Sequence, residues 1–283
     1  MDQPTRPAIP PSPFLPIRAI GLGAPFTWLA GAAGDLRRAP VAALFYGFAF
    51  AAMGWILTWF FNNAVAYVSS LATGFLLVGP FLATGIYDIA RRLERGEAVP
   101  LSKTLTAWRA NASSIGIFTL ILSVLMMVWA RASLITFALF LSSGIPTLKG
   151  LMGQVFSLEH LDFVITWFGV GALFALLVFA ASVVTIPSMM ERDTDTVPAV
   201  LDSFRAVLAN PGPMAVWALA IVLLVGGGMA TGYVGLIVTG PWIGLATWRA
   251  YRDVLGPAPA RSVSGFSEGL KSGISRSDPE PGA

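Results

Sequence analysis

Six stretches of this sequence are almost free of charged residues and long enough to be candidate membrane-spanning helices. An α-helix rises about 1.5 Å per residue, so roughly 20 apolar residues cross a hydrocarbon core of about 30 Å. The pattern predicts an all-α fold, a six-helix transmembrane bundle. The predicted spans are residues 40–61, 64–90, 113–141, 163–187, 214–229 and 233–250.

The composition excludes an ordinary soluble domain. Hydrophobic residues make up 55% of the chain and charged residues only 12%, whereas charged residues are about a quarter of a soluble domain. We therefore predict one membrane domain over residues 25–255. Residues 1–24 are broken by prolines, and residues 256–283 are rich in Pro, Gly and Ser, so both are predicted to be disordered cytoplasmic tails.

Cysteine and histidine are too scarce for most metal and redox chemistry. The chain has no cysteine, which excludes disulfides, thiolate metal sites and cysteine nucleophiles. Its one histidine, His160, excludes a two-histidine metal or haem site within the chain. We expect no cofactor and no bound metal, and we interpret His160 as an exposed loop residue.

The basic residues show how the spans are oriented. The net charge of +3 is compatible with nucleic-acid binding, but the basic residues flank the apolar stretches. All but two of the 18 Lys and Arg residues lie on one side of the predicted spans, Lys149 and Arg131 being the exceptions. Since loops rich in Lys and Arg stay in the cytoplasm, we predict that both termini are cytoplasmic and that nucleic acid is not a partner.

An internal repeat is suggested by a motif near each end. Gly79-Pro80 and Gly240-Pro241 interrupt apolar runs and are each followed by an aromatic residue seven positions after the proline and an arginine eleven positions after it. We predict three hairpin repeats, each preceded by a cytoplasmic interfacial amphipathic helix, within residues 25–38, 93–112 and 193–210. The alternative is that hydrophobic hairpins resemble one another by composition alone.

Several separated motifs resemble a known family. They are Pro25-Phe26-Thr27-Trp28-Leu29, Gly34-Asp35-Leu36, the run from Gly79-Pro80 to Arg91-Arg92, Trp129-Ala130-Arg131-Ala132, the run from Ser182 to Pro187 with Arg192-Asp193, Asn210-Pro211 with Met214, and the run from Ala246 to Asp253. Together, over about residues 24–256, they resemble a bacterial family of predicted integral membrane proteins of unknown function. The resemblance implies a multi-pass protein of a bacterial cytoplasmic (inner) membrane.

The resemblance implies little about activity. The usual form of the last motif resembles Gly-His-Ala-Thr-Trp-His, but Leu245 and Arg249 stand here in place of the histidines. Some family members are labelled as cytochrome c oxidase subunits. Haem-copper chemistry needs several histidine ligands, and this chain has one.

One candidate site is an ion pair between Arg131 and Asp162. Arg131 is the one charge predicted to lie within the membrane, where charged residues are usually functional, and Asp162 lies at the start of the fourth span. The pair is predicted either inside the membrane or at its outer interface. The alternative is that Arg131 extends to the outer headgroups.

A second candidate site lies at the inner ends of two spans. Acids and arginines at helical neighbour spacing there are candidates for binding anions, lipid headgroups or a partner protein; they are Asp88, Arg91, Arg92, Arg249, Arg252 and Asp253. The alternative is ordinary anchoring at the membrane surface. We also predict helix breaks at Gly79, Pro80, Pro187, Gly240 and Pro241.

A small acidic cluster is the third candidate. Glu191, Asp193 and Asp195 are carboxylates suited to a divalent cation at the cytoplasmic face, but a solvated loop is the interpretation that we favour.

Two classes of function fit the sequence. The first is a non-enzymatic scaffold or accessory subunit that binds membrane lipids and either a larger membrane complex or further copies of itself. The second is a small-solute or ion permease, against which the middle of every predicted span lacks Asp, Glu, Lys and His to carry protons. We predict no catalytic residue.

Overall fold

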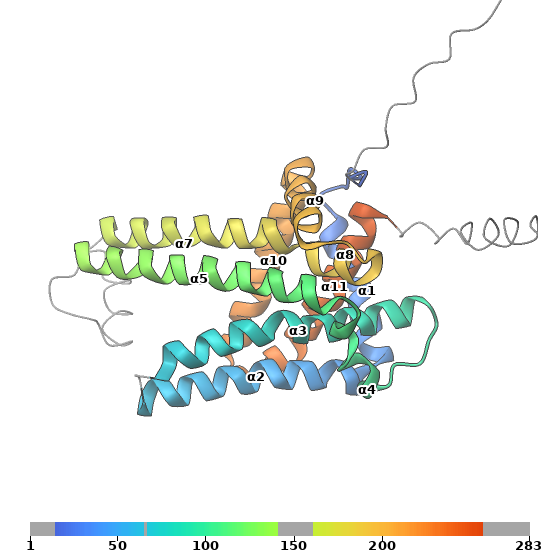
Figure 1. Ribbon diagram of the computed structural model, residues 1–283, viewed down its shortest axis with the longest axis horizontal. Coiled ribbons are helices and arrows are strands. Elements are labelled where there is room, and N and C mark those ends of the chain that lie inside the picture. The colour runs from blue at the N-terminus through green and yellow to red at the C-terminus, as the bar shows by residue number, and fades with distance from the viewer. Residues whose placement is uncertain (1–14, 65–66, 141–160, 257–283) are drawn as a thin grey trace, which may run out of the picture.

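The computed structural model describes residues 15–64, 67–140 and 161–256, and the elements within these ranges are helices (Figure 1). The all-α prediction is confirmed. In chain order the elements are α1 (Ala24–Arg38), α2 (Pro40–Asn63), α3 (Val68–Glu94), α4 (Leu101–Thr104), the 3-10 helix η2 (Ala107–Asn111), α5 (Ala112–Phe140), α7 (Leu161–Ser182), α8 (Thr185–Arg192), α9 (Thr196–Ala209), α10 (Pro211–Ala230) and α11 (Leu236–Leu255).

Five helical stretches within the described ranges are long and apolar enough to cross a membrane. They are Pro40–Asn63, Ser70–Glu94, Leu101–Phe140, Leu161–Arg192 and Pro211–Ala230. The predicted sixth span corresponds to α11, which is not among the five. That helix continues to Leu255 and so includes Arg249, Arg252 and Asp253, whose charges lower its apolar character. The sixth crossing stays a prediction.

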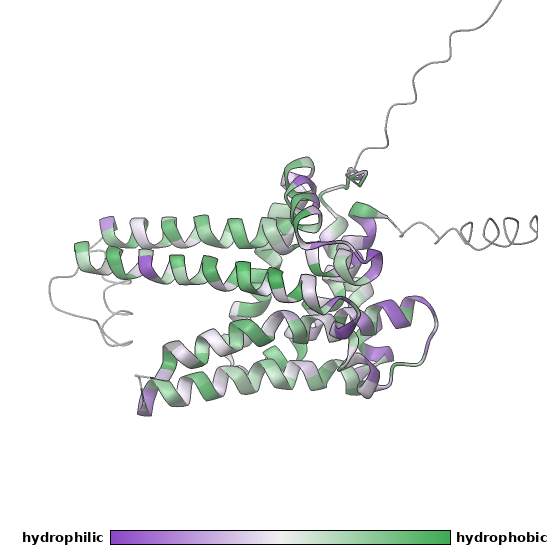
Figure 2. Cartoon of the chain, viewed as in Figure 1, coloured by the Kyte–Doolittle hydropathy of each residue, from purple (hydrophilic) through white to green (hydrophobic). Residues whose placement is uncertain are grey.

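The helices form two long pairs that meet at one end. Figure 1 shows α2 beside α3 and α5 beside α7, and α3 and α5 are also in contact. Helix α11 packs against α1, α2, α3 and α10. We call the end where the pairs meet α1, α8 and α11 the charged end, comprising residues 24–38, 88–97, 185–192 and 245–256. Figure 2 shows hydrophilic residues gathered there.

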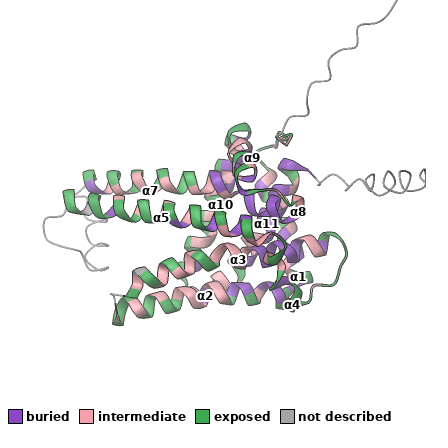
Figure 3. Cartoon of the chain, in the orientation of Figure 1, coloured by how far each residue is buried: buried purple, intermediate pink, exposed green. Residues whose placement is uncertain are grey.

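Burial is concentrated at the charged end, whereas most residues toward the other end are exposed or half-buried (Figure 3). The large buried side chains include Trp248 and Tyr251 on α11 and Met189 on α8. Toward the far end, Leu139 on α5 and Ile165 on α7 are 77% and 68% exposed. Lipid tails are as apolar as these side chains, so a membrane accommodates this surface without a protein core beneath it.

Helix α11 lies against α2 along part of its length. Gly47 of α2 faces the backbone carbonyl of Ile237, and a side chain at position 47 would collide with it. Further along α2, the indole N–H of Trp55 donates to the Gly232 carbonyl at 2.6 Å, and Thr58 hydrogen bonds with the Tyr233 hydroxyl at 2.9 Å. The turn between α10 and α11 is therefore attached to the far half of α2.

The predicted fourth span, residues 163–187, is two helices. Helix α7 ends at Ser182, and α8 begins at Thr185. The backbone N–H of Val184, released at the break, donates to the Ser203 hydroxyl of α9 at 3.4 Å. Pro187 is not the break, because it lies in the first turn of α8, where a missing N–H costs no helical hydrogen bond.

The two Gly-Pro motifs do not end their helices. Pro80 lies inside α3 and Pro241 inside α11, and each helix is continuous through the motif, contrary to the predicted breaks. A proline inside a helix removes one backbone hydrogen bond, and packing by neighbouring helices keeps such segments helical. Gly79 and Gly240 are therefore helical residues.

The predicted interfacial helices differ in form. Helices α1 and α9 lie at the first and third predicted positions, whereas residues 93–112 contain the single turn α4 and the short η2. The Thr104 and Thr106 hydroxyls there donate to the carbonyls of Leu101 and Lys103, and such bonds compete with longer helices. This difference weakens the three-unit repeat, which stays a prediction.

Some predictions lie outside the described residues. These are the parts of the two predicted tails at residues 1–14 and 257–283, the exposed loop position of His160, and the position of Lys149.

Candidate functional site

A buried carboxylate lies at the end of α3. Asp88 is completely buried and pairs with Arg91 and with Arg92, whose Nε lies 2.6 Å from its Oδ2. Arg91 also donates to the carbonyl of Met190 on α8 at 3.3 Å. A carboxylate removed from water needs such partners, because an unpaired buried charge is strongly destabilising. Asp88 thus fixes two arginines, one of which reaches α8.

Arg252 joins three helices. Its Nε lies 2.9 Å from Glu94 at the end of α3, and its Nη1 lies 2.8 Å from Glu191 at the end of α8. The Trp248 indole N–H also donates to Glu94, at 3.1 Å. Since the Arg252 guanidinium carries donors on both sides, one residue of α11 binds two carboxylates from different helices.

Arg249 joins α11 to α1. Its Nε and Nη2 donate to Oδ2 of Asp35 at 2.9 and 2.7 Å, and Asp35 is buried. The guanidinium lies over Gly31, where any added Cβ would collide with it. The absence of a side chain at position 31 thus makes room for this ion pair.

Arg192 holds the C-terminal end of α11. It donates to the Tyr251 hydroxyl at 2.9 Å and to the carbonyls of Leu255 and Gly256 at 2.9 and 2.8 Å. These carbonyls have no partner within the helix, and a cation at a helix C-terminus is also favourable. Tyr251 follows the predicted sixth span. Burial raises the pKa of its hydroxyl, the nearby Glu191 carboxylate raises it further, and Arg192 acts in the opposite direction.

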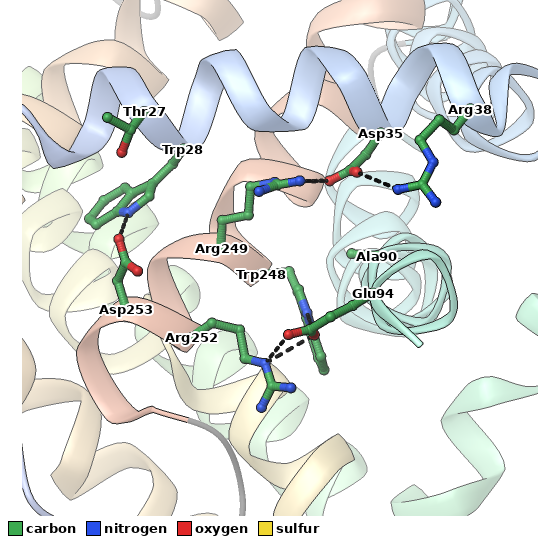
Figure 4. A pocket seen from close by; sticks show the side chains of 10 residues that line it. All are labelled: Thr27, Trp28, Asp35, Arg38, Ala90, Glu94, Trp248, Arg249, Arg252 and Asp253. Atoms are coloured by element: carbon green, nitrogen blue, oxygen red, sulfur yellow. Dashed lines mark hydrogen bonds and ion pairs between the residues drawn. The ribbon is translucent and has the colours of Figure 1, made fainter. Parts of the chain in front are cut away.

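A cavity of about 300 Å³ opens between α1, α3 and α11 at the charged end (Figure 4). Across it, the Trp28 indole N–H donates to Oδ2 of Asp253 at 2.6 Å. The polar and aromatic side chains that line the cavity include Trp28, Asp35, Arg38, Glu94, Arg249 and Asp253. Its wall combines three carboxylates with three arginines, the third being Arg252.

The six predicted inner-end residues lie together at the charged end, but not all pair as their spacing suggests. Asp88 pairs with Arg91 and Arg92 on its own helix. Arg249 and Arg252 instead bind carboxylates from other helices, and Asp253 accepts from Trp28. Sequence spacing missed Trp28, Asp35, Glu94 and Arg192. The available signal was charge: Asp35 and Glu94 are acids beside clusters of arginine.

Arg131 and Asp162 lie toward the far end, on α5 and in the first turn of α7, and both are exposed. Among the ion pairs of the described residues, none joins them. One Asp162 oxygen accepts the N–H of Phe163 at 2.9 Å, so it satisfies one of the N–H groups that have no helical partner in the first turn of α7.

The three acids at the end of α8 and just after it have separate environments. Glu191 pairs with Arg252, Asp193 has a left-handed backbone conformation with φ of 54°, and Asp195 precedes α9. In the part of the chain that the structure describes, no group of three or more Asp, Glu, His or Cys side chains is arranged to hold a metal ion.

Comparison with known proteins then tests the family resemblance. Residues 68–191 match the model of a family described as predicted integral membrane protein (DUF2189). The resemblance is confirmed over this segment. The DUF2189 segment runs from the start of α3 to Glu191, so it includes Asp88 and Arg131 but not Arg249, Arg252 or Asp253. No curated protein and no solved structure was found to match the chain.

The DUF2189 match and the apolar helices agree on the class of protein. The chain is an integral membrane protein with several helices capable of crossing a membrane, and the description of DUF2189 names no activity.

Proposed function

We propose that this protein is a non-enzymatic scaffold or accessory subunit of a bacterial cytoplasmic membrane, with both termini in the cytoplasm, and that it binds lipids and membrane-protein partners. The supporting observation is that the charged and the apolar parts of the molecule are separated in space. Charged groups are paired with one another at one end, and the long helices beyond that end expose broad apolar faces. A rigid base carrying apolar helices suits attachment to other membrane helices.

The exposed faces lie on several helices. Val222 and Leu223 of α10 are each 65% exposed, and Leu139 of α5 and Ile165 of α7 are exposed as well. Apolar surface of this kind requires lipid or another transmembrane helix next to it. The charged end is stabilised from within, because most of its acids bind its arginines. We therefore place partner contacts on the apolar faces.

A permease is less well supported. Transport across the membrane requires polar groups along the depth of the bundle. Along α5, the hydroxyls of Thr119, Ser123 and Thr136 instead donate to carbonyls one turn earlier in the same helix. The cavity described above lies at the charged end and is walled by ion pairs, so it gives no support to a path through the helices.

Our proposal includes a sixth crossing by α11, completing three hairpins. The α10–α11 turn is bound by Trp55, which lies about 23 Å along α2 from its first residue at 1.5 Å per residue. The two ends of α11 would then lie near opposite membrane surfaces. The charged residues that lower its hydropathy occupy its last turns, at the charged end.

The test is isolation of the full chain from its own membranes in mild detergent. We expect a membrane protein to accompany it at a fixed ratio, measured by native mass spectrometry. A photo-reactive residue at Val222, Leu139 or Ile165 should cross-link to that partner, and one at the exposed Arg95 should not. A chain that emerges alone and transports solute in liposomes would contradict the scaffold and support the permease.

A further inference from the structure

The cavity at the charged end has an unequal distribution of charge along its length. Two of its three arginines are bound to two of its three carboxylates, Arg252 to Glu94 and Arg249 to Asp35. The other two charged residues of its wall are Arg38 and Asp253. The Arg38 guanidinium, 59% exposed, lies 3.8 Å from Asp35, and Asp253 forms no ion pair with another described residue. The charges of the cavity wall therefore sum to zero, but the Arg38 cation and the Asp253 anion are not fully neutralised by a neighbour.

These two charges lie at different ends of the cavity. Figure 4 shows Asp253 beside Trp28, and Arg38 beside Asp35, with Arg249 between them. Arg249 uses Nε and Nη2 on Asp35, which leaves Nη1 as a further donor. The Arg38 end thus offers two guanidiniums against one carboxylate, and the Asp253 end offers a carboxylate next to an indole ring. A ligand that matches both ends has a cationic and an anionic group in one small molecule.

The side chains at each end of the cavity limit which chemical groups the ligand can contain. Two guanidiniums suit a phosphate, whose several oxygens accept from both. A primary ammonium donates hydrogen bonds to a carboxylate and is attracted to an indole face. A volume of about 300 Å³ is at the lower end of small-molecule sites. A phosphate joined to a primary amine through two carbons satisfies all three conditions.

The position of the cavity indicates how the ligand arrives. Ala90 and Glu94, which line it, belong to the last turns of the candidate span Ser70–Glu94. We propose that this cavity binds a phosphoethanolamine group, the headgroup of a zwitterionic aminophospholipid. The inference rests on the lipid binding in the proposed function, and names the lipid class and its site.

The experiment uses the purified full-length protein in detergent micelles. Binding is measured for a short-chain phosphatidylethanolamine, for phosphatidylglycerol and phosphatidylcholine of the same chain length, and for free O-phosphoethanolamine. We expect phosphatidylethanolamine to bind at least about tenfold more tightly than the other two lipids, because loss of a charge-assisted hydrogen bond costs about that factor. Equal binding of phosphatidylglycerol would overturn the proposal, since that headgroup has no cation.

Matched variants locate the site. Asp253→Asn keeps an oxygen to accept from Trp28 and removes only the negative charge, and Arg38→Gln removes the cation from an exposed position. Each should weaken phosphatidylethanolamine binding about tenfold. Arg37→Gln, the adjacent arginine outside the cavity, and Asp162→Asn, an exposed carboxylate elsewhere, should leave it within twofold. Unchanged binding in both cavity variants would overturn the proposal.

Two further measurements keep the outcome clear. Arg38→Lys retains the cation and should restore most of the affinity, whereas a merely unfolded Arg38→Gln protein would also show a lower melting temperature. Free O-phosphoethanolamine that displaces the lipid at similar concentration assigns the site to a soluble aminophosphate. Failure to displace it assigns the site to the lipid. Partner capture from membranes is independent of these results, so failure of one proposal is distinguishable from failure of the other.

Discussion

At Gly47 the absence of a side chain decides how closely α2 and α11 approach. The residue faces the carbonyl of Ile237, a backbone atom that cannot move aside without shifting the whole helix. At Gly31 the neighbour is instead the Arg249 guanidinium, the end of a flexible side chain. A methyl group is therefore more costly at position 47 than at position 31.

We predict that Gly47→Ala lowers the free energy of unfolding by about 1–3 kcal/mol, the usual cost of overpacking. Denaturant titration in detergent micelles measures this change. The matched control is Gly74→Ala on α3, where no atom lies within 4 Å of the added Cβ, and where alanine favours the helix. A Gly47→Ala protein as stable as the Gly74→Ala protein would show that the two helices do not meet as described.

At the scale of elements, the corner between α9 and α10 holds the segment that precedes α1. The buried Asn210 side chain accepts the N–H of Ile20 at 2.9 Å and donates to the carbonyl of Arg18 at 3.1 Å. Arg205 of α9 donates to the carbonyl of Leu15 at 3.2 Å. One asparagine thus supplies both a donor and an acceptor to a stretch outside any helix.

We predict that Asn210→Ala releases this segment while leaving the helices intact. Hydrogen exchange at Ile20 should accelerate about tenfold or more, because a buried hydrogen bond to its N–H is lost. Exchange in the middle of α2 and α7 should not change. Asn62→Ala, at an exposed position near the end of α2, serves as the control and should leave Ile20 protected. Equal exchange in both variants would contradict the role of Asn210.

Apolar run length predicted the elements better than their ends. The long helices α2, α3 and α5 follow from their long apolar runs. The break after Ser182 did not, because Val183 and Val184 are as apolar as their neighbours and the compensating Ser203 is remote in sequence. The same limit applies to the candidate site. The pairing of Asp88 with its arginines could be predicted because they are neighbours on one helix. The pairing of Arg249 with Asp35 could not, because the sequence does not show which helices are in contact.

At the scale of the whole molecule, the orientation and the sixth crossing are testable because the chain has no cysteine of its own. We predict that single cysteines at Asn62 and at Val234, which is 55% exposed in the α10–α11 turn, react with a membrane-impermeant maleimide on intact cells. A cysteine at the exposed Glu97 of the charged end should react only after permeabilisation. The cysteine-free parent measures background labelling. If Val234→Cys were labelled only after permeabilisation, the predicted sixth crossing would be wrong.

The two ends of the described chain lie close together and are joined by a backbone hydrogen bond. The N–H of Arg18 donates to the carbonyl of Val254 at 2.9 Å, next to the Trp28–Asp253 hydrogen bond and the Asp35–Arg249 ion pair. A tether attached to either terminus would therefore pull on the same set of bonds. A mechanical force applied at either terminus would reach α1 and α11 together, before it reached the long apolar helices.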